Sequence, residues 1–202
     1  MVMPVAHRVA RAHEVRVRVA TDADLPAVRC IITTAYAPYE RMLGPLVFER
    51  YLSDLLDLDG HRQRGLILVA VLHGVVCGAV AYCPDATLQQ VGWPAGWASG
   101  RALAVDSPSR GMGVAEALAR DVQRRAVEDG AEVLALHTAE FMVGARALYD
   151  RLGFQRVPDL DADLRNYLGS CGQGPVPALA YIRPLTPAGV DAASHVDEEL
   201  AS

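Results

Sequence analysis

The feature that most constrains the fold is a pair of glycines between a short apolar stretch and an amphipathic one. The segment "SPSRGMGVAEALARD", residues 107–121, places Gly111 and Gly113 directly ahead of a run whose apolar residues recur at i, i+4 spacing. That spacing is typical of a helix with one buried stripe. The pattern predicts a strand over 101–105, a glycine loop, and a helix over 113–128, a unit found in layered α/β proteins.

A helix that begins just after two glycines is suited to binding an anion. Its first backbone N–H groups have no partner within the helix, and the helix dipole is positive at that end. Glycine has no Cβ atom, so a diphosphate can approach these amides closely. The loop therefore predicts a diphosphate cradle, and a plain glycine turn is the structural alternative.

Three kinds of diphosphate ligand fit such a loop in general. A P-loop needs a lysine after its second glycine, and all nineteen basic residues of this chain are arginine. A dinucleotide site needs glycine or alanine where Glu116 stands, and an acidic residue after the next strand, which ends here in Thr138. Both nucleotide ligands are therefore disfavoured, and coenzyme A remains.

The segment 110–115, "RGMGVA", resembles the R/Q-x-x-G-x-G/A signature of the GNAT superfamily of acetyl-CoA-dependent acyltransferases. The segment 145–154, "ARALYDRLGF", is similar to a later helix and strand of that family. The segment 18–31, "RVATDADLPAVRCI", is similar to its first strand and helix. The three segments follow the family's order, and the resemblance covers about residues 15–185.

The resemblance implies an α/β (α+β) fold with a mixed, mostly antiparallel central sheet, helices on both faces, and a splayed pair of strands at 101–105 and 132–138. It implies acetyl-CoA as co-substrate. The implied cofactor-binding residues are Leu103, Ala104 and Val105, whose backbone would pair with pantetheine, and Arg110, Gly111, Met112, Gly113, Val114 and Ala115, whose amides would hold the diphosphate. A backbone amide near 103–104 would polarise the thioester carbonyl.

The implied reaction is direct attack of a primary amine of a small molecule or peptide on the thioester. Tyr149 stands at the family's general-acid position, where a phenol can protonate the leaving thiolate; a core tyrosine is the alternative. Two positions depart from the family. Met142 replaces an asparagine that commonly contacts the cofactor, and Ser99 replaces a glutamate that often serves as base. The general base is therefore unassigned.

Several other polar or aromatic residues are weaker candidates for the acceptor site, and each has a structural alternative. His137 lies near the expected splay, and Trp93 and Trp97 lie in a glycine-rich segment, where we expect one of them near the acceptor. The remaining candidates are Tyr39, Glu40 and Asp85.

Two further functions stay open. One is a protein acetyltransferase that acts on N-termini or lysines. The other is a CoA-binding module with little catalysis, which the departures at Ser99 and Met142 favour. The expected partner is an amine acceptor, and a homodimer is compatible with the sequence.

Composition supports one globular domain, which we place at 15–185, between flexible segments at 1–14 and 186–202. Apolar residues make up 51% of the chain. The net charge is −5, and residues 186–202 hold four acids and no arginine, so the rest of the chain is close to neutral. This balance disfavours nucleic acid as a partner.

With no long apolar run and no secretory signal, we expect no membrane association and a cytoplasmic location. The four cysteines lack metal-ligand spacing, so we expect reduced thiols and no metal.

Turn residues and periodicity predict the remaining elements. The expected strands cover 15–19, 66–72, 75–83, 153–157 and 178–185, with a hairpin turn at His73-Gly74. The expected helices follow Thr21, cover 46–58 up to Gly60, and cover 142–152.

Overall fold

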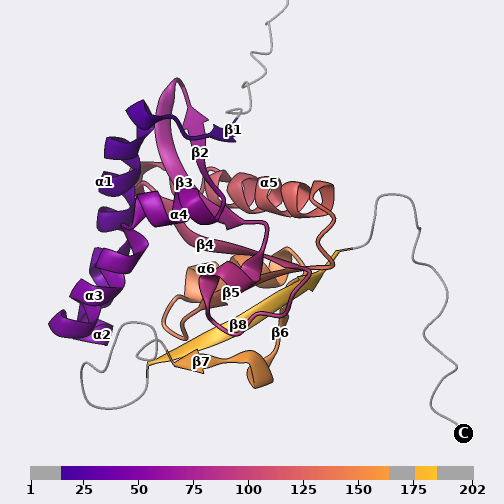
Figure 1. The fold of residues 1–202 in the computed structure, drawn as a ribbon. Helices are drawn as coiled ribbons and strands as arrows, with labels where there is room; N and C mark the ends of the chain where they lie inside the picture. Colours follow the sequence, from indigo (N-terminus) through magenta and orange to yellow (C-terminus); the bar gives the residue numbers. More distant parts are fainter. Residues whose placement is uncertain (1–14, 164–175, 186–202) are drawn as a thin grey trace, which may run out of the picture.

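Eight strands form a sheet at the centre of the molecule, which we describe from a computed structural model over residues 15–163 and 176–185 (Figure 1). The predicted flexible segments 1–14 and 186–202 lie outside the described residues. The strands are β1 (Arg16–Val19), β2 (Leu66–Leu72), β3 (Val75–Cys83), β4 (Trp97–Val105), β5 (Val133–Thr138), β6 (Gln155–Arg156), β7 (Ala162–Asp163) and β8 (Pro177–Pro184). Their order is β1-β2-β3-β4-β5-β8-β6, and β7 pairs with β8.

The sheet is mixed and mostly antiparallel, which confirms the predicted fold class. Every neighbouring pair runs antiparallel except β4 and β5, which are parallel. The helix α5 supplies the crossover between these two strands, because parallel neighbours cannot be joined by a tight turn. The glycine loop therefore lies at the start of the one crossover that joins parallel neighbours in the described sheet.

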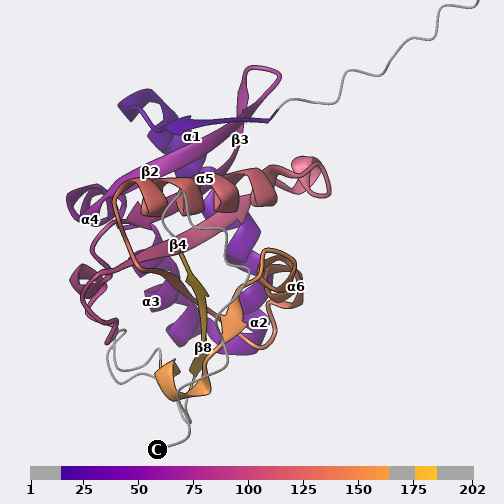
Figure 2. The same ribbon diagram turned by 90° about the vertical axis from the view of Figure 1, so that its right-hand side faces the viewer.

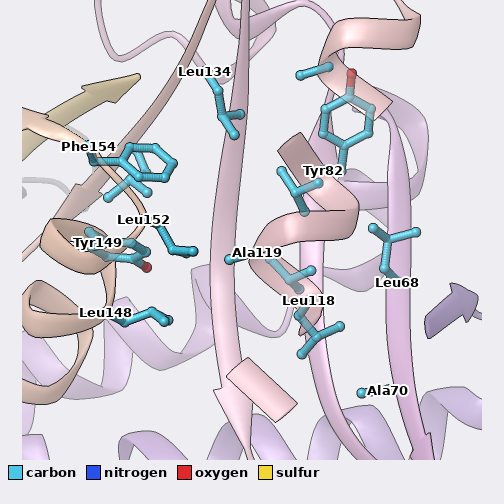
Figure 3. Packing of buried hydrophobic residues seen from close by; sticks show 14 of the residues in the cluster. Leu68, Ala70, Tyr82, Leu118, Ala119, Leu134, Leu148, Tyr149, Leu152 and Phe154 are labelled. Carbon is cyan, nitrogen blue, oxygen red and sulfur yellow. The ribbon is translucent and has the colours of Figure 1, made fainter. Parts of the chain in front are cut away.

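Helices cover both faces of the sheet (Figure 2). They are α1 (Leu25–Tyr36), α2 (Glu40–Leu43), α3 (Pro45–Leu55), α4 (Leu58–Arg64), α5 (Val114–Glu128) and α6 (Val143–Arg151). On one face, α5 buries Leu118 against β2, β3 and β4, while Leu148 of α6 and Leu152, which follows this helix, are buried beside β5 (Figure 3). On the other face, Ile32 of α1 and Leu55 of α3 pack against β2 and β3.

The hairpin between β2 and β3 is confirmed. His73 and Gly74 have φ angles of +53° and +81°, the left-handed conformations that a tight two-residue hairpin turn requires. Gly60 does not end a helix as predicted: α3 ends at Leu55, and Gly60 lies within α4. The carboxylate of Asp57 accepts a hydrogen bond from the Gly60 amide at 3.0 Å and so caps this additional helix.

The first helical segment follows Thr21, as expected, and opens with a 3₁₀ turn. Thr21 precedes a short 3₁₀ turn, and α1 begins only at Leu25. Asp24 accepts from the Thr21 amide at 2.7 Å and from two nitrogens of Arg18 at 2.7 and 2.9 Å. These hydrogen bonds hold the pKa of the Asp24 carboxyl well below its usual range. The pair ties β1 to the beginning of α1.

His61 is a buried titratable group in α4. Its Nε2–H donates to the Leu55 carbonyl at 3.2 Å, and its Nδ1 lies 3.4 Å from Nη2 of Arg64. Burial and the charges of Arg101 and Arg64 lower the pKa of His61 from 6.5 to about 4. The folded protein therefore holds this imidazole neutral at pH values where the unfolded chain protonates it.

We expect the stability of the protein to fall as the pH drops from 6.5 to about 4, the window set by His61. The unfolded state binds more protons there, so the free energy of unfolding decreases with falling pH, by roughly 3 kcal/mol from this group. Urea unfolding of the wild type and of His61→Leu at several pH values measures the effect. The variant should show a smaller pH dependence, and parallel curves would rule out this role of His61.

Candidate active site

The strands β4 and β5 separate after a short paired segment. Trp97 to Ser99 pair with Val133 to Ala135, and the pairing stops there. Beyond this point a cavity of about 790 Å³ opens, lined by β4 from Gly100 to Val105 and by β5 from Leu136 to Thr138. The predicted splay is therefore present. Ser99 lies at the fork, fully buried, and its Oγ has no hydrogen-bond partner in the described part of the chain.

A β-bulge lies in β4 at the edge of this cavity. Ala79 of β3 lies opposite Ala104, but Ala81 lies opposite Arg101, so β4 contains one extra residue. Ala102 has a φ angle of +55°, a conformation that non-glycine residues rarely adopt. As a result Arg101 and Ala102 both face the side covered by α1 and α3. The bulge turns β4 so that its edge borders the gap between β4 and β5.

The three β4 residues that the resemblance assigns to pantetheine binding all line the cavity. They are Leu103, Ala104 and Val105. The Leu103 carbonyl accepts a hydrogen bond from the Tyr36 hydroxyl at 3.3 Å, and a carbonyl oxygen has a second lone pair for another donor. Because β5 has already diverged, this edge of β4 is open to an added strand-like partner.

The glycine loop has the conformation of an anion cradle. Gly111 and Gly113 have φ angles of +78° and +80°, and a Cβ atom at either position would meet nothing within 4 Å. Their amides, like those of the first three residues of α5, donate to no acceptor in the described structure. The amides of Arg110 and Met112 instead close turns, to the carbonyls of Ser107 and Ser109 at 3.3 and 3.4 Å.

The other cofactor-binding candidates in this loop divide into exposed and buried side chains. Arg110 is exposed and lines the cavity, and Met112 is also exposed. Val114 is fully buried against the sheet and fixes the first turn of α5, and Ala115 packs at the edge of the same cluster. Val114 and Ala115 can thus offer only their backbone amides to a ligand.

Tyr149 of α6 lines the cavity from the side opposite α1. Its ring is 7% exposed and packs against Phe154 and Tyr181, with centroids 5.5 and 6.1 Å away. Its hydroxyl points from α6 toward the strand that carries Leu134 in Figure 3, and it has no hydrogen-bond partner among the described residues. Burial raises the pKa of Tyr149, so the phenol stays protonated and can donate a proton.

Three more tyrosines and an ion pair line the cavity from α1, α3 and the segment between α1 and α2. The ring of Tyr36 lies 5.8 Å from those of Tyr39 and Tyr51, edge to face. Arg101 of β4 forms an ion pair with Asp54 of α3. Sequence reasoning anticipated only Tyr39 here. The available signal was an arginine in the otherwise apolar strand segment 101–105, and a Tyr–Asp pair three residues apart on one helix face.

His137 also lines the cavity. Its ring stacks on Trp93 with centroids 4.3 Å apart, and its Nε2–H donates to the Leu160 carbonyl at 3.1 Å. Burial lowers the pKa of His137, which keeps the imidazole neutral with Nδ1 able to accept a proton. Trp93 therefore supports the site from behind His137, and Trp97 packs on Trp93 at 6.0 Å; neither indole lines the cavity.

The remaining candidates have structural positions. Glu40 is exposed outside the cavity lining, and Asp85 caps a turn by accepting from the amide and hydroxyl of Thr87. Met142 precedes α6 and is buried in the cavity wall, where its sulfur accepts from the Thr138 hydroxyl at 3.6 Å. A methionine cannot replace the hydrogen bonds of the asparagine found there in the resembled family.

Residues 15–163 and 176–185 contain no group of three or more side chains placed to hold a metal ion. Cys30, Cys77 and Cys83 are free thiols, as expected, and Cys171 lies outside the described residues. None of the described helices is long and apolar enough to cross a membrane.

Known proteins match this chain in both sequence and fold. The sequence model of the Acetyltransferase (GNAT) family matches residues 31–154. The chain is 31% identical over 115 residues to N-acetylaspartate synthetase of Danio rerio, a match that covers 54% of this chain and 37% of that protein. The chain thus spans little more than a third of that relative's length.

Solved structures share the fold at low identity. An N-acetyltransferase from Staphylococcus aureus superimposes with a TM-score of 0.61 at 17% identity, covering 86% of this chain and 99% of that one. The Salmonella typhimurium protein yncA, solved with its cofactor acetyl-CoA, superimposes with a TM-score of 0.58 at 17% identity, covering 89% and 99%. Because the family model matches more than half of the chain, the chain belongs to the acetyltransferase (GNAT) family.

Proposed function

We propose that the protein transfers the acetyl group of acetyl-CoA to the primary amine of a small molecule. The observation that carries the proposal is that three features border one cavity. They are the open edge of β4, Arg110 at the head of the glycine loop, and Tyr149. The similarity to N-acetylaspartate synthetases supports a small-molecule amine over a protein substrate.

The residues present fit coenzyme A. Five amides without acceptors, those of Gly111 and residues 113–116, face a region that no Cβ atom of either glycine fills. Amides at a helix N-terminus bind phosphate groups well. The edge of β4 from Leu103 to Val105 offers backbone groups to the peptide-like amides of pantetheine. When bound, acetyl-CoA supplies the activated acetyl thioester.

The residues of the chain have three tasks in such a reaction. We expect the amides at the bulge of β4 to donate to an acyl oxygen as negative charge develops on it. Tyr149 holds a proton at its Oη for a leaving thiolate, and its buried ring excludes water from that side. The tyrosines of α1 and α3 enclose the part of the cavity where the amine binds.

The test is a thiol-release assay with acetyl-CoA and a panel of amino acids, polyamines, aromatic amines and short peptides, with the acetylated product identified by mass spectrometry. We expect thiol release that depends on a small amine. Acetyl-CoA binding without amine-dependent release would identify a CoA-binding module instead. Release with peptides alone would identify a protein acetyltransferase.

A further inference from the structure

Arg101 is a charged side chain on the inner wall of the cavity. It lies in β4 between the fork at Ser99 and the bulge at Ala102, and its side chain is 22% exposed. Its guanidinium contacts Asp54 of α3 through Nη2, the one hydrogen bond of this side chain within the described residues. A guanidinium carries five N–H donors, so most of its capacity is unused.

Tyr51 lines the same cavity as this guanidinium. It is one helical turn before Asp54 on α3, so both side chains lie on the same helix face. Both Tyr51 and Arg101 line the cavity, and the carboxylate that Arg101 contacts belongs to Asp54 on that same face of α3. The Tyr51 hydroxyl has no hydrogen-bond partner among the residues described. Arg101 and Tyr51 therefore both present donors to the cavity.

Arginines outnumber carboxylates in the cavity lining. Its lining contains the three arginines Arg64, Arg101 and Arg110 but only two carboxylates, Asp54 and Asp57, although the whole chain has a net charge of −5. Arg64 lies 3.5 Å from Asp57. Arg101 pairs with Asp54, so the arginine of this lining that has no carboxylate partner among the described residues is Arg110 at the glycine loop; Arg101 offers a ligand its N–H donors beyond the Asp54 contact. The natural complement is an anion.

We infer that the acceptor amine carries a carboxylate, which binds to the guanidinium of Arg101 and the hydroxyl of Tyr51. The planar guanidinium matches a carboxylate with two parallel hydrogen bonds. Asp54 is a positioning residue that holds Arg101 against α3. Tyr51, Arg101 and Tyr149 line the same cavity, so one substrate can place its carboxylate at Arg101 and its amine on the side of Tyr149. The inference rests on the proposed function and names its substrate class.

The test compares amines that differ only in the carboxylate, 3-aminopropanoate with propylamine and aspartate with its diamide. The wild type should favour the carboxylated member at least tenfold in kcat/KM. In Arg101→Gln, the KM for carboxylated amines should rise about tenfold to a hundredfold, the range of a charge-assisted hydrogen bond. The KM for the neutral amines should change less than about threefold. Arg101→Lys, which keeps the charge but not the fork, should be intermediate.

The matched control is Arg125→Gln. Arg125 is also 22% exposed and pairs with Asp121, but it lies on α5 away from the cavity lining. A binding measurement complements the assay: isothermal titration of succinate, which has no amine, into each protein with CoA present. The wild type and Arg125→Gln should bind succinate, and Arg101→Gln should not.

Two results would overturn the carboxylate site and leave the proposed function intact. One is an equal kcat/KM of the wild type for the carboxylated and the neutral amine of each pair. The other is an equal rise of KM for both amines in Arg101→Gln. Failure of every amine to release thiol would overturn the proposed function. The succinate titration would still decide whether Arg101 binds a carboxylate.

Discussion

Replacing Tyr149 with phenylalanine is expected to lower kcat about a hundredfold or more while the affinity for acetyl-CoA stays within about twofold. General acids typically contribute a factor of 10² to 10⁴. The substitution removes only the hydroxyl, which has no hydrogen-bond partner among the described residues, and keeps the ring that packs on Phe154 and Tyr181. Steady-state thiol release gives kcat, and calorimetric titration gives the affinity.

Tyr82→Phe is the matched control for this experiment. Tyr82 is also a buried tyrosine, but its hydroxyl donates to Asp129 at 2.6 Å and it does not line the cavity. Loss of the Tyr82 hydroxyl should lower the free energy of unfolding and leave kcat unchanged. The raised pKa of Tyr149 adds a second expectation: kcat should show no loss from tyrosine ionisation up to about pH 10, the ordinary pKa of a phenol. Unchanged turnover in Tyr149→Phe would remove this residue from the acid role.

Replacing Gly113 with leucine is expected to weaken acetyl-CoA binding about tenfold or more. The side chain would project into open space at the N-terminus of α5, where the unpartnered amides are placed to bind the diphosphate. Each charge-assisted hydrogen bond lost costs about 1.5–3 kcal/mol, enough for such a decrease. Calorimetric titration with CoA measures the change without relying on turnover.

Gly130→Leu separates this effect from backbone strain. Gly130 follows α5 at its other end, has a φ angle of +76°, and also has open space around its Cβ direction. Both substitutions force leucine into the left-handed region, at a cost of about 1–2 kcal/mol. Both variants should therefore lose similar stability, and only Gly113→Leu should lose CoA affinity. Equal affinity in the two variants would refute the cradle.

The glycine loop and the hairpin between β2 and β3 could be predicted because their signals are local. The start of α5 is encoded within a few residues by Gly111, Gly113 and the apolar spacing that follows. The hairpin at His73-Gly74 is encoded in the same way. The boundary at Gly60 was wrong because the Asp57 cap starts a new helix there, and a glycine in the first turn of a helix resembles one that ends it.

The acceptor side of the cavity could not be predicted, because its residues meet only through tertiary packing. Arg101 and Asp54 are 47 residues apart and lie on different layers of the fold. The bulge was equally hidden, since the left-handed residue is Ala102 and not a glycine. The splay was expected from family resemblance alone, and its extent depends on where the β4–β5 pairing stops, which no local pattern encodes.

The extra residue in β4 also limits how this chain can change in evolution. Before the bulge, Gly100 faces α5; after it, Leu103 and Val105 do, so the alternation of the strand is reversed between them. Deleting one residue there would keep nearly every local signal in the sequence, yet it would turn Leu103 and Val105 from the face packed by α5 to the face covered by α1 and α3. Related sequences should therefore vary by substitution in this strand and confine changes of length to the loops around it.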